Sequence, residues 1–274
     1  MLAVITGASS GIGAAFARHL AQQAYDVLLI ARRRNRLEEL ARDLTESYGI
    51  RAEILEADLC DPADLEQADL RVRSAPDLAM LVNNAGFGTN GYFWEVDLLE
   101  QERMQLLHVV ATARLTHAAL ANLTRRAARG TGVINVSSVA AFGGGPLNVG
   151  YCATKAWMNM FTATLSAELR RRSSPVKVQA LCPGFTLSEF HDVLKTDRSA
   201  IPGWLWLTSD FVVQESLAAF ARGKLIVVPG IWYKLLVTFM RWTPEALIRH
   251  FAGRAVQKYR RSSSRLHQAD SQHQ

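Results

Sequence analysis

The sequence predicts an α/β fold: a doubly wound parallel sheet of about seven strands in a single domain. Short apolar runs alternate with helical patterns along most of the chain, without an internal repeat. The run at 78–82 is continuously apolar, which is typical of a parallel strand buried on both faces. With 274 residues, 49% of them hydrophobic, the chain can bury a sizeable core, and no linker rich in Pro, Gly or Ser divides it.

The first predicted unit is a strand at 2–6, a glycine turn and a helix. The loop has the spacing TGxxxGxG, not GxGxxG. Glycine permits a tight turn and lets backbone amides approach a pyrophosphate, whose charge is favoured at a helix N-terminus. A plain turn is the alternative. We predict a dinucleotide site formed by Thr6, Gly7, Ser9, Ser10, Gly11, Ile12 and Gly13.

The second predicted strand, at 26–31, ends in three consecutive arginines. An acidic side chain at this position would accept hydrogen bonds from ribose hydroxyls, whereas arginine suits a 2′-phosphate. The alternative is the solvated start of the next helix, although cations are poorly placed at a helix N-terminus. Arg32 and Arg33 therefore predict that NADP(H) is preferred over NAD(H).

The third and fourth predicted strands, at 52–56 and 78–82, also end in polar residues. Asp58, followed by Leu59, is positioned to accept from an adenine amine, or to serve as a turn aspartate. The fourth strand leads into Asn83, Asn84, Ala85 and Gly86. Adjacent asparagines can tie down neighbouring backbone and leave glycine room for a cofactor ring, or they can simply cap the loop.

The fifth strand, at 132–136, follows a long helical segment at about 98–123 that contains His108. The strand ends in a serine pair that includes Ser138, and Tyr151 stands thirteen residues later. On a helix, Tyr151 and Lys155 share one face, and a nearby cation favours a phenolate. This pair suits acid/base chemistry, with a chance surface pair as the alternative.

The remainder of the chain is predicted to complete the sheet and then leave it. A strand at 176–181 leads to Pro183 and Gly184, and a final strand lies at 224–228. Residues 185–222 are expected to be a substrate-loop insertion whose aromatic side chains form either an apolar substrate wall or ordinary packing. Residues 231–261, divided by Pro244, are expected to be a helical extension, and 262–274 a disordered tail.

Charge and cysteine content exclude several classes of function. The net charge of +6 is concentrated after residue 240, where seven cations face two acids, so no nucleic-acid partner is predicted. Three dispersed cysteines without a CxxC motif predict buried thiols and neither a disulfide framework nor a metal site. The first residues enter a strand without a secretory signal, which predicts a cytoplasmic protein.

Taken together, these ordered motifs resemble the single-domain short-chain dehydrogenases/reductases, over about residues 2–190 and the last strand. The resemblance implies a Rossmann-type sheet, a homodimer or homotetramer, and a carbonyl or alcohol substrate, here expected to be apolar. It implies that Tyr151 exchanges a proton with the substrate oxygen, that Lys155 holds the nicotinamide ribose and lowers the pKa of Tyr151, and that Ser138 hydrogen-bonds the reacting oxygen. The residues implied to border the nicotinamide are Pro183, Gly184, Thr186 and Ser188.

Two positions depart from the family pattern. Ser188 stands where threonine is common, and His108 stands where asparagine usually supports a water that passes protons to the lysine. Imidazole also donates and accepts, so His108 is retained as a catalytic candidate. The departure motivates an alternative, a nucleotide-binding regulatory or scaffold protein with little turnover. The C-terminal extension is predicted to cover the substrate cleft or a subunit partner, with peripheral membrane contact as the alternative.

Overall fold

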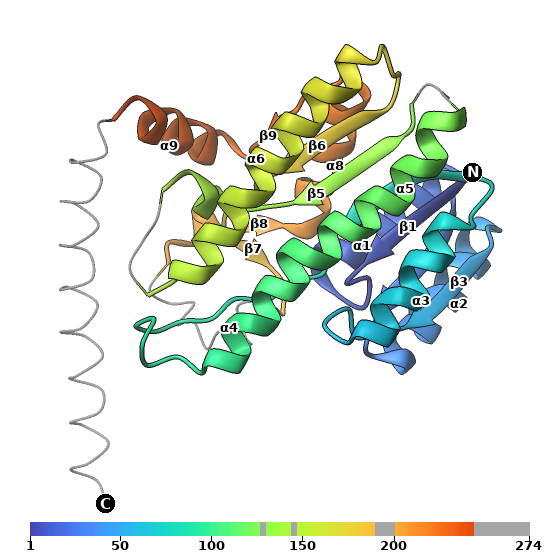
Figure 1. Cartoon of the computed structure of the whole chain (residues 1–274), viewed down its shortest axis with the longest axis horizontal. Coiled ribbons are helices and arrows are strands. Elements are labelled where there is room, and N and C mark those ends of the chain that lie inside the picture. Colours follow the sequence, from blue (N-terminus) through green and yellow to red (C-terminus); the bar gives the residue numbers. More distant parts are fainter. Residues whose placement is uncertain (127–129, 144–146, 190–200, 244–274) are drawn as a thin grey trace, which may run out of the picture.

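The computed structural model describes residues 1–126, 130–143, 147–189 and 201–243. Its centre is a parallel sheet of seven strands in the order β3-β2-β1-β4-β5-β6-β9 (Figure 1). The predicted fold class is confirmed, and six strands lie within a residue or so of the predicted ranges. The strands are β1 (Leu2–Thr6), β2 (Asp26–Ala31), β3 (Ala52–Glu56), β4 (Leu78–Asn83), β5 (Gly132–Val136), β6 (Lys177–Leu181) and β9 (Ile226–Val227).

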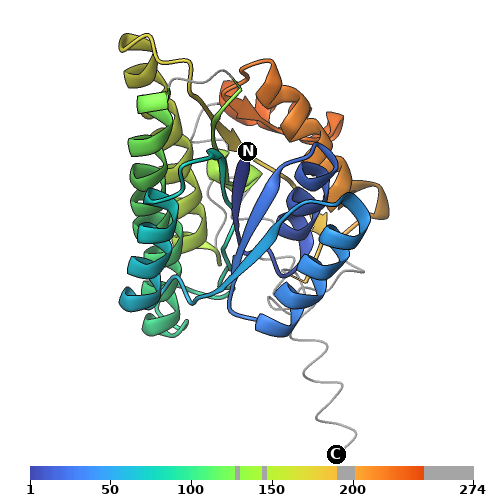
Figure 2. The ribbon, with the colours of Figure 1, turned by 90° about the vertical axis from the view of Figure 1, so that its right-hand side faces the viewer.

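Helices cover both faces of the sheet and give three layers (Figure 2). The first face carries α1 (Gly11–Gln22), α2 (Arg34–Tyr48) and α8 (Ser209–Ala221). The second face carries α3 (Pro62–Arg73), α5 (Thr112–Arg126) and α6 (Val149–Arg171). Because every crossover between neighbouring parallel strands must run over a face, this arrangement follows from the alternation of strands and helices.

The core lies between the sheet and each helical layer. Every residue of β1 and β4 is buried. On the first face Phe16 of α1 and Phe220 of α8 are buried, and on the second face Leu115 of α5 and Leu169 of α6. Burial of one such side chain stabilises the fold by roughly 1.5–3 kcal/mol. The two helical layers therefore hold the sheet in place, including the edge where the predicted polar site residues follow the strands.

The ends of α2 and α3 follow from local sequence. The Asp61 side chain accepts hydrogen bonds from the N–H groups of Ala63 and Asp64, and Pro62 occupies the first turn, where its missing N–H costs nothing. Helix α2 ends at Gly49, whose φ of +67° is a left-handed conformation that glycine adopts without strain.

The structure refines three predicted segments. The expected helix at about 98–123 consists of α4 (Leu98–Gln105), a π-helical turn η1 (Leu106–Ala111) and α5. The expected insertion at 185–222 contains α8, a sheet-covering helix, besides the small strands β7 (Thr186–Leu187) and β8 (Leu207–Thr208) and the 3-10 turn η4 (Gly203–Leu205). The last strand, β9, has two residues, whereas five were expected.

The C-terminal extension begins with α9 (Ile231–Trp242), as expected for the part before Pro244. Its predicted second half, to residue 261, and the predicted tail at 262–274 lie outside the described residues. All three cysteines are free; Cys152 and Cys182 are buried as predicted, whereas Cys60 is partly exposed.

None of the helices in the described ranges has the length and apolar character needed to cross a bilayer.

Candidate active site

The glycine loop lies after β1, at the point where the strand order reverses between β1 and β4. Gly7 has a φ of +65°, and a Cβ at Gly13 would stand 2.3 Å from the Gly7 carbonyl oxygen. Ser10 precedes α1, but its side chain makes no capping hydrogen bond to the helix. The helix N-terminus is therefore bordered by backbone, as a pyrophosphate site requires.

Thr6 and Asn84 hold this loop against the end of β4. The Thr6 hydroxyl oxygen accepts from the N–H groups of Asn84 (2.9 Å) and Ala85 (3.0 Å). The Asn84 amide donates to the carbonyl oxygens of Thr6 (2.9 Å) and Gly7 (3.2 Å). Asn84 thus ties down neighbouring backbone as predicted, whereas the Asn83 amide donates to side chains, among them that of Asn135 (2.8 Å).

Arg33 lies against the glycine loop, whereas no hydrogen bond or ion pair joins Arg32 to that loop within the described ranges. The Arg33 guanidinium donates to the hydroxyls of Ser9 (3.0 Å) and Ser10 (2.9 Å), and to the Glu189 carboxylate (2.7 Å). Arg32 is exposed, near enough to Asp58 to act on its charge. Of the two predicted arginines, Arg33 is therefore the one built into the loop.

Asp58 lies on the same edge after β3, but part of its accepting capacity is occupied. Its carboxylate accepts from the Cys60 N–H (3.0 Å) and from Arg103 (2.7 Å). Burial raises the pKa of Asp58, but these hydrogen bonds and the charge of Arg103 outweigh burial and lower it. The following residue, Leu59, is buried in the core of the second face. A carboxylate has about four acceptor positions, so an adenine amine still has a partner here.

Ser138, Tyr151 and Lys155 come together at the end of β5. Ser138 begins the short 3-10 turn η2 (Val139–Phe142) and accepts from the Ala140 N–H (3.1 Å). A hydrogen bond also joins the side chains of Ser138 and Tyr151. The Lys155 ammonium lies 5.7 Å from the centre of the Tyr151 ring and donates to the Val136 carbonyl (2.8 Å).

The charges of this group do not follow the expected direction. Burial of the phenol raises the pKa of Tyr151 to about 12, and the hydrogen bond from Ser138 offsets only part of this increase. Burial likewise lowers the pKa of Lys155 to about 8. Desolvation thus outweighs the hydrogen bond from Ser138, and the phenol keeps its proton at neutral pH.

His108 lies on η1, fully buried beside Tyr151, with ring centroids 5.9 Å apart. The Thr154 hydroxyl donates to the Tyr151 carbonyl (2.9 Å), so the contact of His108 Nδ1 with that hydroxyl (2.9 Å) makes Nδ1 the donor. Nε2 is then an acceptor, and it has no partner among the described residues. Burial, then the charge of Lys155, hold the pKa of His108 well below its ordinary value. His108 is therefore neutral.

The absence of a side chain at Gly86 makes room for the His108 imidazole. A Cβ at Gly86 would stand 2.6 Å from His108 Nε2. The glycine that the sequence assigned to a cofactor ring therefore also accommodates the histidine. The pairing of these two positions was not predicted, because nothing in the spacing of 86 and 108 brings them together.

Residues 183–188 form the wall of the candidate site that lies opposite the glycine loop. The Thr186 hydroxyl donates to the Gly184 carbonyl (3.0 Å) and Ser188 donates to the Thr186 carbonyl (3.3 Å). A Cβ at Gly11 would stand 2.9 Å from the Ser188 Cβ, so this segment folds back over the glycine loop. The predicted nicotinamide-bordering residues and the predicted pyrophosphate loop thus face each other.

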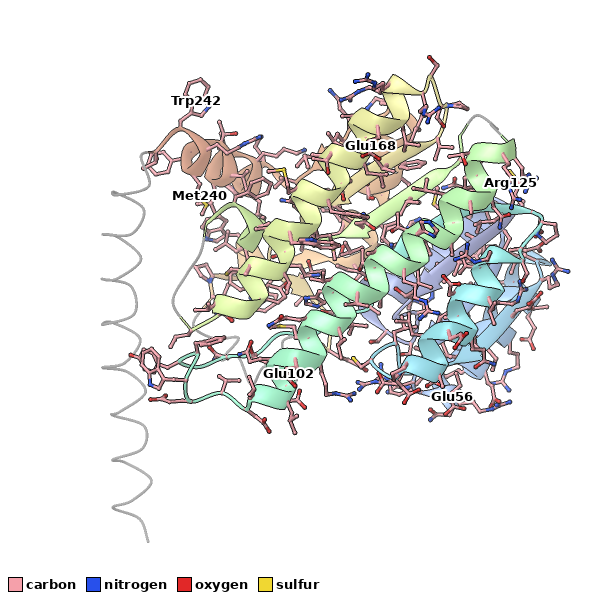
Figure 3. All side chains as sticks on the ribbon, in the orientation of Figure 1. Glu56, Glu102, Arg125, Glu168, Met240 and Trp242 are labelled. Carbon is pink, nitrogen blue, oxygen red and sulfur yellow. The ribbon has the colours of Figure 1, made fainter. Side chains whose placement is uncertain are left out.

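Helix α9 covers this wall, through residues that sequence analysis did not single out. A Cβ at Gly184 would stand 2.1 Å from the Tyr233 ring, and the Tyr233 hydroxyl accepts from the Phe185 N–H (3.0 Å) and donates to the Leu205 carbonyl (2.8 Å). Farther along α9, Met240 packs on Gly143, just after η2. Figure 3 shows Met240 and Trp242 on opposite sides of this helix. Other site residues missed by sequence analysis are Thr154 and Glu189.

These residues fit a dinucleotide. The loop has no space for side chains at Gly7 and Gly13, and the helix N-terminus adjoins it. Arg33, Ser9 and Ser10 supply donors for an anionic group. Tyr151, Ser138 and Lys155 provide acid/base groups on the same sheet edge, and within the described ranges no cluster of three or more His, Cys, Asp or Glu side chains would hold a metal ion.

Comparison with known proteins gives consistent matches. A family model described as short chain dehydrogenase matches residues 1–199. The chain is 29% identical over 241 residues to a 3-oxoacyl acyl-carrier-protein reductase of Aquifex aeolicus, covering 84% of this chain and 96% of that protein. It is 29% identical to a very-long-chain 3-oxoacyl-CoA reductase of Anas platyrhynchos, over 70% of this chain and 62% of that one. A short-chain dehydrogenase from Sphingobium yanoikuyae in complex with NADPH has a TM-score of 0.79 and 31% identity, covering 89% and 97% of the two chains.

Proposed function

Because the chain belongs to the short-chain dehydrogenase family, and is therefore an NAD(P)-dependent dehydrogenase/reductase, we propose that it is an NADP(H)-dependent oxidoreductase. The substrate is an apolar molecule with a carbonyl or alcohol group. The observation that carries the proposal is the placement of Tyr151, whose phenol shares a hydrogen bond with Ser138 and whose ring centre lies 5.7 Å from the Lys155 ammonium. The nicotinamide supplies or accepts the hydride when it is bound.

The residues of this chain have separate tasks in the proposed reaction. In carbonyl reduction, Tyr151 donates its phenolic proton to the substrate oxygen, and Ser138 donates a hydrogen bond to the same oxygen. Lys155 stabilises the resulting phenolate, because a cation within reach lowers the pKa of a phenol once charge develops on it. In alcohol oxidation each proton moves in the opposite direction. His108 positions the helix that carries Tyr151 by its hydrogen bond to Thr154.

Two features support NADP(H) and an apolar substrate. Arg33 is held by Ser9 and Ser10 where a 2′-phosphate would meet the glycine loop, and the solved relative from Sphingobium yanoikuyae is described in complex with NADPH. The wall opposite Tyr151 is aromatic, with the rings of Phe185 and Trp206 5.6 Å apart. The two sequence relatives are named for 3-oxoacyl substrates, whose reacting carbonyl adjoins an alkyl chain.

A spectrophotometric screen tests the proposed activity. Purified protein with NADPH is presented with aldehydes, ketones and 3-oxoacyl thioesters of increasing chain length. We expect NADPH oxidation that depends on the carbonyl compound, and a loss of roughly 10²–10⁴-fold in Tyr151→Phe. NADPH binding without any turnover across the panel would instead support the alternative, a nucleotide-binding protein with little activity.

We also propose a homodimer or homotetramer formed through α6 and the continuous helical segment α4–η1–α5, which lies beside α6 in Figure 1. Leu106 and Val110 on η1 and Met160 on α6 are exposed apolar residues on this layer. Burial of such a surface against a second copy is favourable. Light scattering at micromolar concentration tests it: a monomeric mass would contradict the proposal, and Met160→Glu should weaken an oligomer.

Helix α9 is proposed to cover the substrate cleft or a subunit partner in a cytoplasmic protein, and the alternative is peripheral membrane contact through its outer face. Tyr233 and Val237 are buried on the inner side. The outer side exposes six large apolar residues, and the chain after it is basic. These residues are Ile231, Trp232, Leu235, Leu236, Phe239 and Trp242.

Two measurements separate the roles of α9. Truncation after Gly230 should impair turnover or folding if α9 covers the cleft. Co-sedimentation of the intact chain with anionic vesicles, weakened by salt, would support membrane contact, whereas absence of binding at low salt would reject it.

A further inference from the structure

A compact group of donors surrounds one carboxylate at the glycine loop. Arg33 donates to Glu189 through one guanidinium nitrogen (2.7 Å) and to Ser9 and Ser10 through its other nitrogens. Arg36, one helical turn farther along α2, has a nitrogen 3.7 Å from the second carboxylate oxygen. Two cations and two hydroxyls therefore gather around a single anion supplied by the chain itself.

Glu189 is placed there by the wall opposite the loop. It follows Ser188, which packs on Gly11, and it lies two residues after the end of β7. The β7 backbone is held in turn: the Ser209 hydroxyl donates to the Leu187 carbonyl (3.2 Å). The carboxylate is ionised at neutral pH, since hydrogen bonding to Arg33 lowers the pKa of Glu189 below its ordinary value.

The same donors suit a phosphate. A guanidinium binds phosphate and carboxylate oxygens with similar geometry, and serine hydroxyls add hydrogen bonds. A phosphate beside Arg33 would stand next to the Glu189 carboxylate, and two anions at such a distance repel each other. Arg33 can therefore serve Glu189 or a phosphate fully, but not both.

We propose that Glu189 is an internal competitor for the 2′-phosphate of the cofactor, and so sets the degree of preference for NADP(H). This inference rests on the proposed use of Arg33 for that phosphate. Binding of NADP(H) exchanges the Arg33–Glu189 pair for an Arg33–phosphate pair. Binding of NAD(H), which has a hydroxyl at that position, leaves the Arg33–Glu189 pair intact. Wild-type affinity for NADP(H) is thus lower than the arginine and serines alone would give.

The Arg33–Glu189 pair is partly exposed, which limits how strongly Glu189 can weaken binding of the 2′-phosphate. The side chains of Arg33 and Glu189 are 43% and 40% exposed, so solvent screens their attraction. Removal of the competing charge should tighten binding of a 2′-phosphate by roughly threefold to tenfold. A compound without that phosphate should change by less than about twofold, because its binding does not displace the carboxylate.

Titration calorimetry with fragments isolates this contact. The probes are 2′,5′-ADP and 5′-AMP, which differ at the 2′-phosphate and make no nicotinamide contacts. Glu189→Gln keeps the size of the side chain and removes its charge. Glu38→Gln is the matched control, because Glu38 is an exposed acid on α2 that pairs with Arg34 and not with Arg33. NADPH and NADH are then titrated into the same proteins.

The outcomes distinguish this inference from the proposed cofactor preference. We expect Glu189→Gln to tighten 2′,5′-ADP and NADPH and the control to leave both unchanged. Unchanged or weaker binding of 2′,5′-ADP in Glu189→Gln would overturn the competition and make Glu189 a residue that orients Arg33. If Glu38→Gln tightens binding of 2′,5′-ADP as much as Glu189→Gln does, the change is an effect of net charge and the proposed competition is overturned. If the wild type binds 2′,5′-ADP no tighter than 5′-AMP, and Arg33→Ala alters neither, the cofactor preference itself fails.

Discussion

Replacement of Lys155 by Met should raise the stability of the cofactor-free protein at neutral pH, although it removes a group required for the proposed reaction. The Lys155 side chain is buried, and its ammonium donates to the Val136 carbonyl (2.8 Å). Burial lowers its pKa from 10.5 to about 8. Methionine keeps a similar length and apolar stem without the charge.

The size of the expected stability gain follows from the difference between the pKa of Lys155 in the folded state and its pKa in the unfolded state. Below pH 8 the ammonium is charged in both states, and its lower pKa in the folded state means that folding is penalised by about 3 kcal/mol. Between pH 8 and 10.5 the unfolded chain binds more protons than the folded one, so stability rises with pH and the penalty disappears. Loss of the bond to Val136 offsets the gain from methionine by roughly 1–3 kcal/mol at every pH.

The pH dependence is therefore a sharper test than stability at one pH. We expect the difference in free energy of unfolding between Lys155→Met and the wild type to fall by roughly 2–3 kcal/mol from pH 7 to pH 10, measured by denaturant titration. Lys177→Met is the control, because Lys177 also donates to a backbone carbonyl, that of Ala221, but is partly exposed. A difference that stays constant with pH would refute the argument that Lys155 is charged at the expense of stability.

Three further changes have expected outcomes. Gly13→Ala should cost roughly 1–3 kcal/mol of stability and abolish measurable NADPH binding by calorimetry, because the added Cβ meets the loop carbonyl; normal binding would contradict the loop geometry. Tyr233→Phe should lower the free energy of unfolding by roughly 1–3 kcal/mol, since it removes the hydrogen bonds of the Tyr233 hydroxyl to the Phe185 N–H and the Leu205 carbonyl, and an unchanged value would mean that α9 docks without these bonds. His108→Asn should leave the pH–rate profile between pH 6 and 8 unaltered, because the imidazole is already neutral; loss of a wild-type inflection near pH 6.5 would show otherwise.

The fold was predictable because each signal was local. The apolar run at β4, the glycine turn before α1 and the arginines after β2 each lie within a few residues of the element they specify. The small last strand and α8 were harder. Helix α8 lies in a segment whose aromatic residues suggested a substrate loop, and its role appears only when Val212 and Phe220 are seen packed on the sheet.

The candidate site was predictable where a motif fixes the residues and not where packing brings them together. Thr6, Asn84, Tyr151 and Lys155 were found because their spacing on one strand or helix is informative. Glu189, by contrast, meets Arg33 across 156 residues of sequence. No periodicity or local motif reports a contact at that separation, so only the folded chain shows it.

The direction of the Tyr151 pKa shift shows a second limit of spacing arguments. The i,i+4 pair correctly predicts that Tyr151 and Lys155 share a helix face, but spacing does not report how deeply that face is buried. Burial favours the neutral form of each group, so it raises the pKa of Tyr151, lowers that of Lys155 and keeps His108 uncharged. Of the three, only Lys155 exchanges its proton near pH 8. Among these three groups, a titration in that range therefore belongs to the lysine, and we expect the phenol to become a better acid only where the ammonium beside it is kept charged.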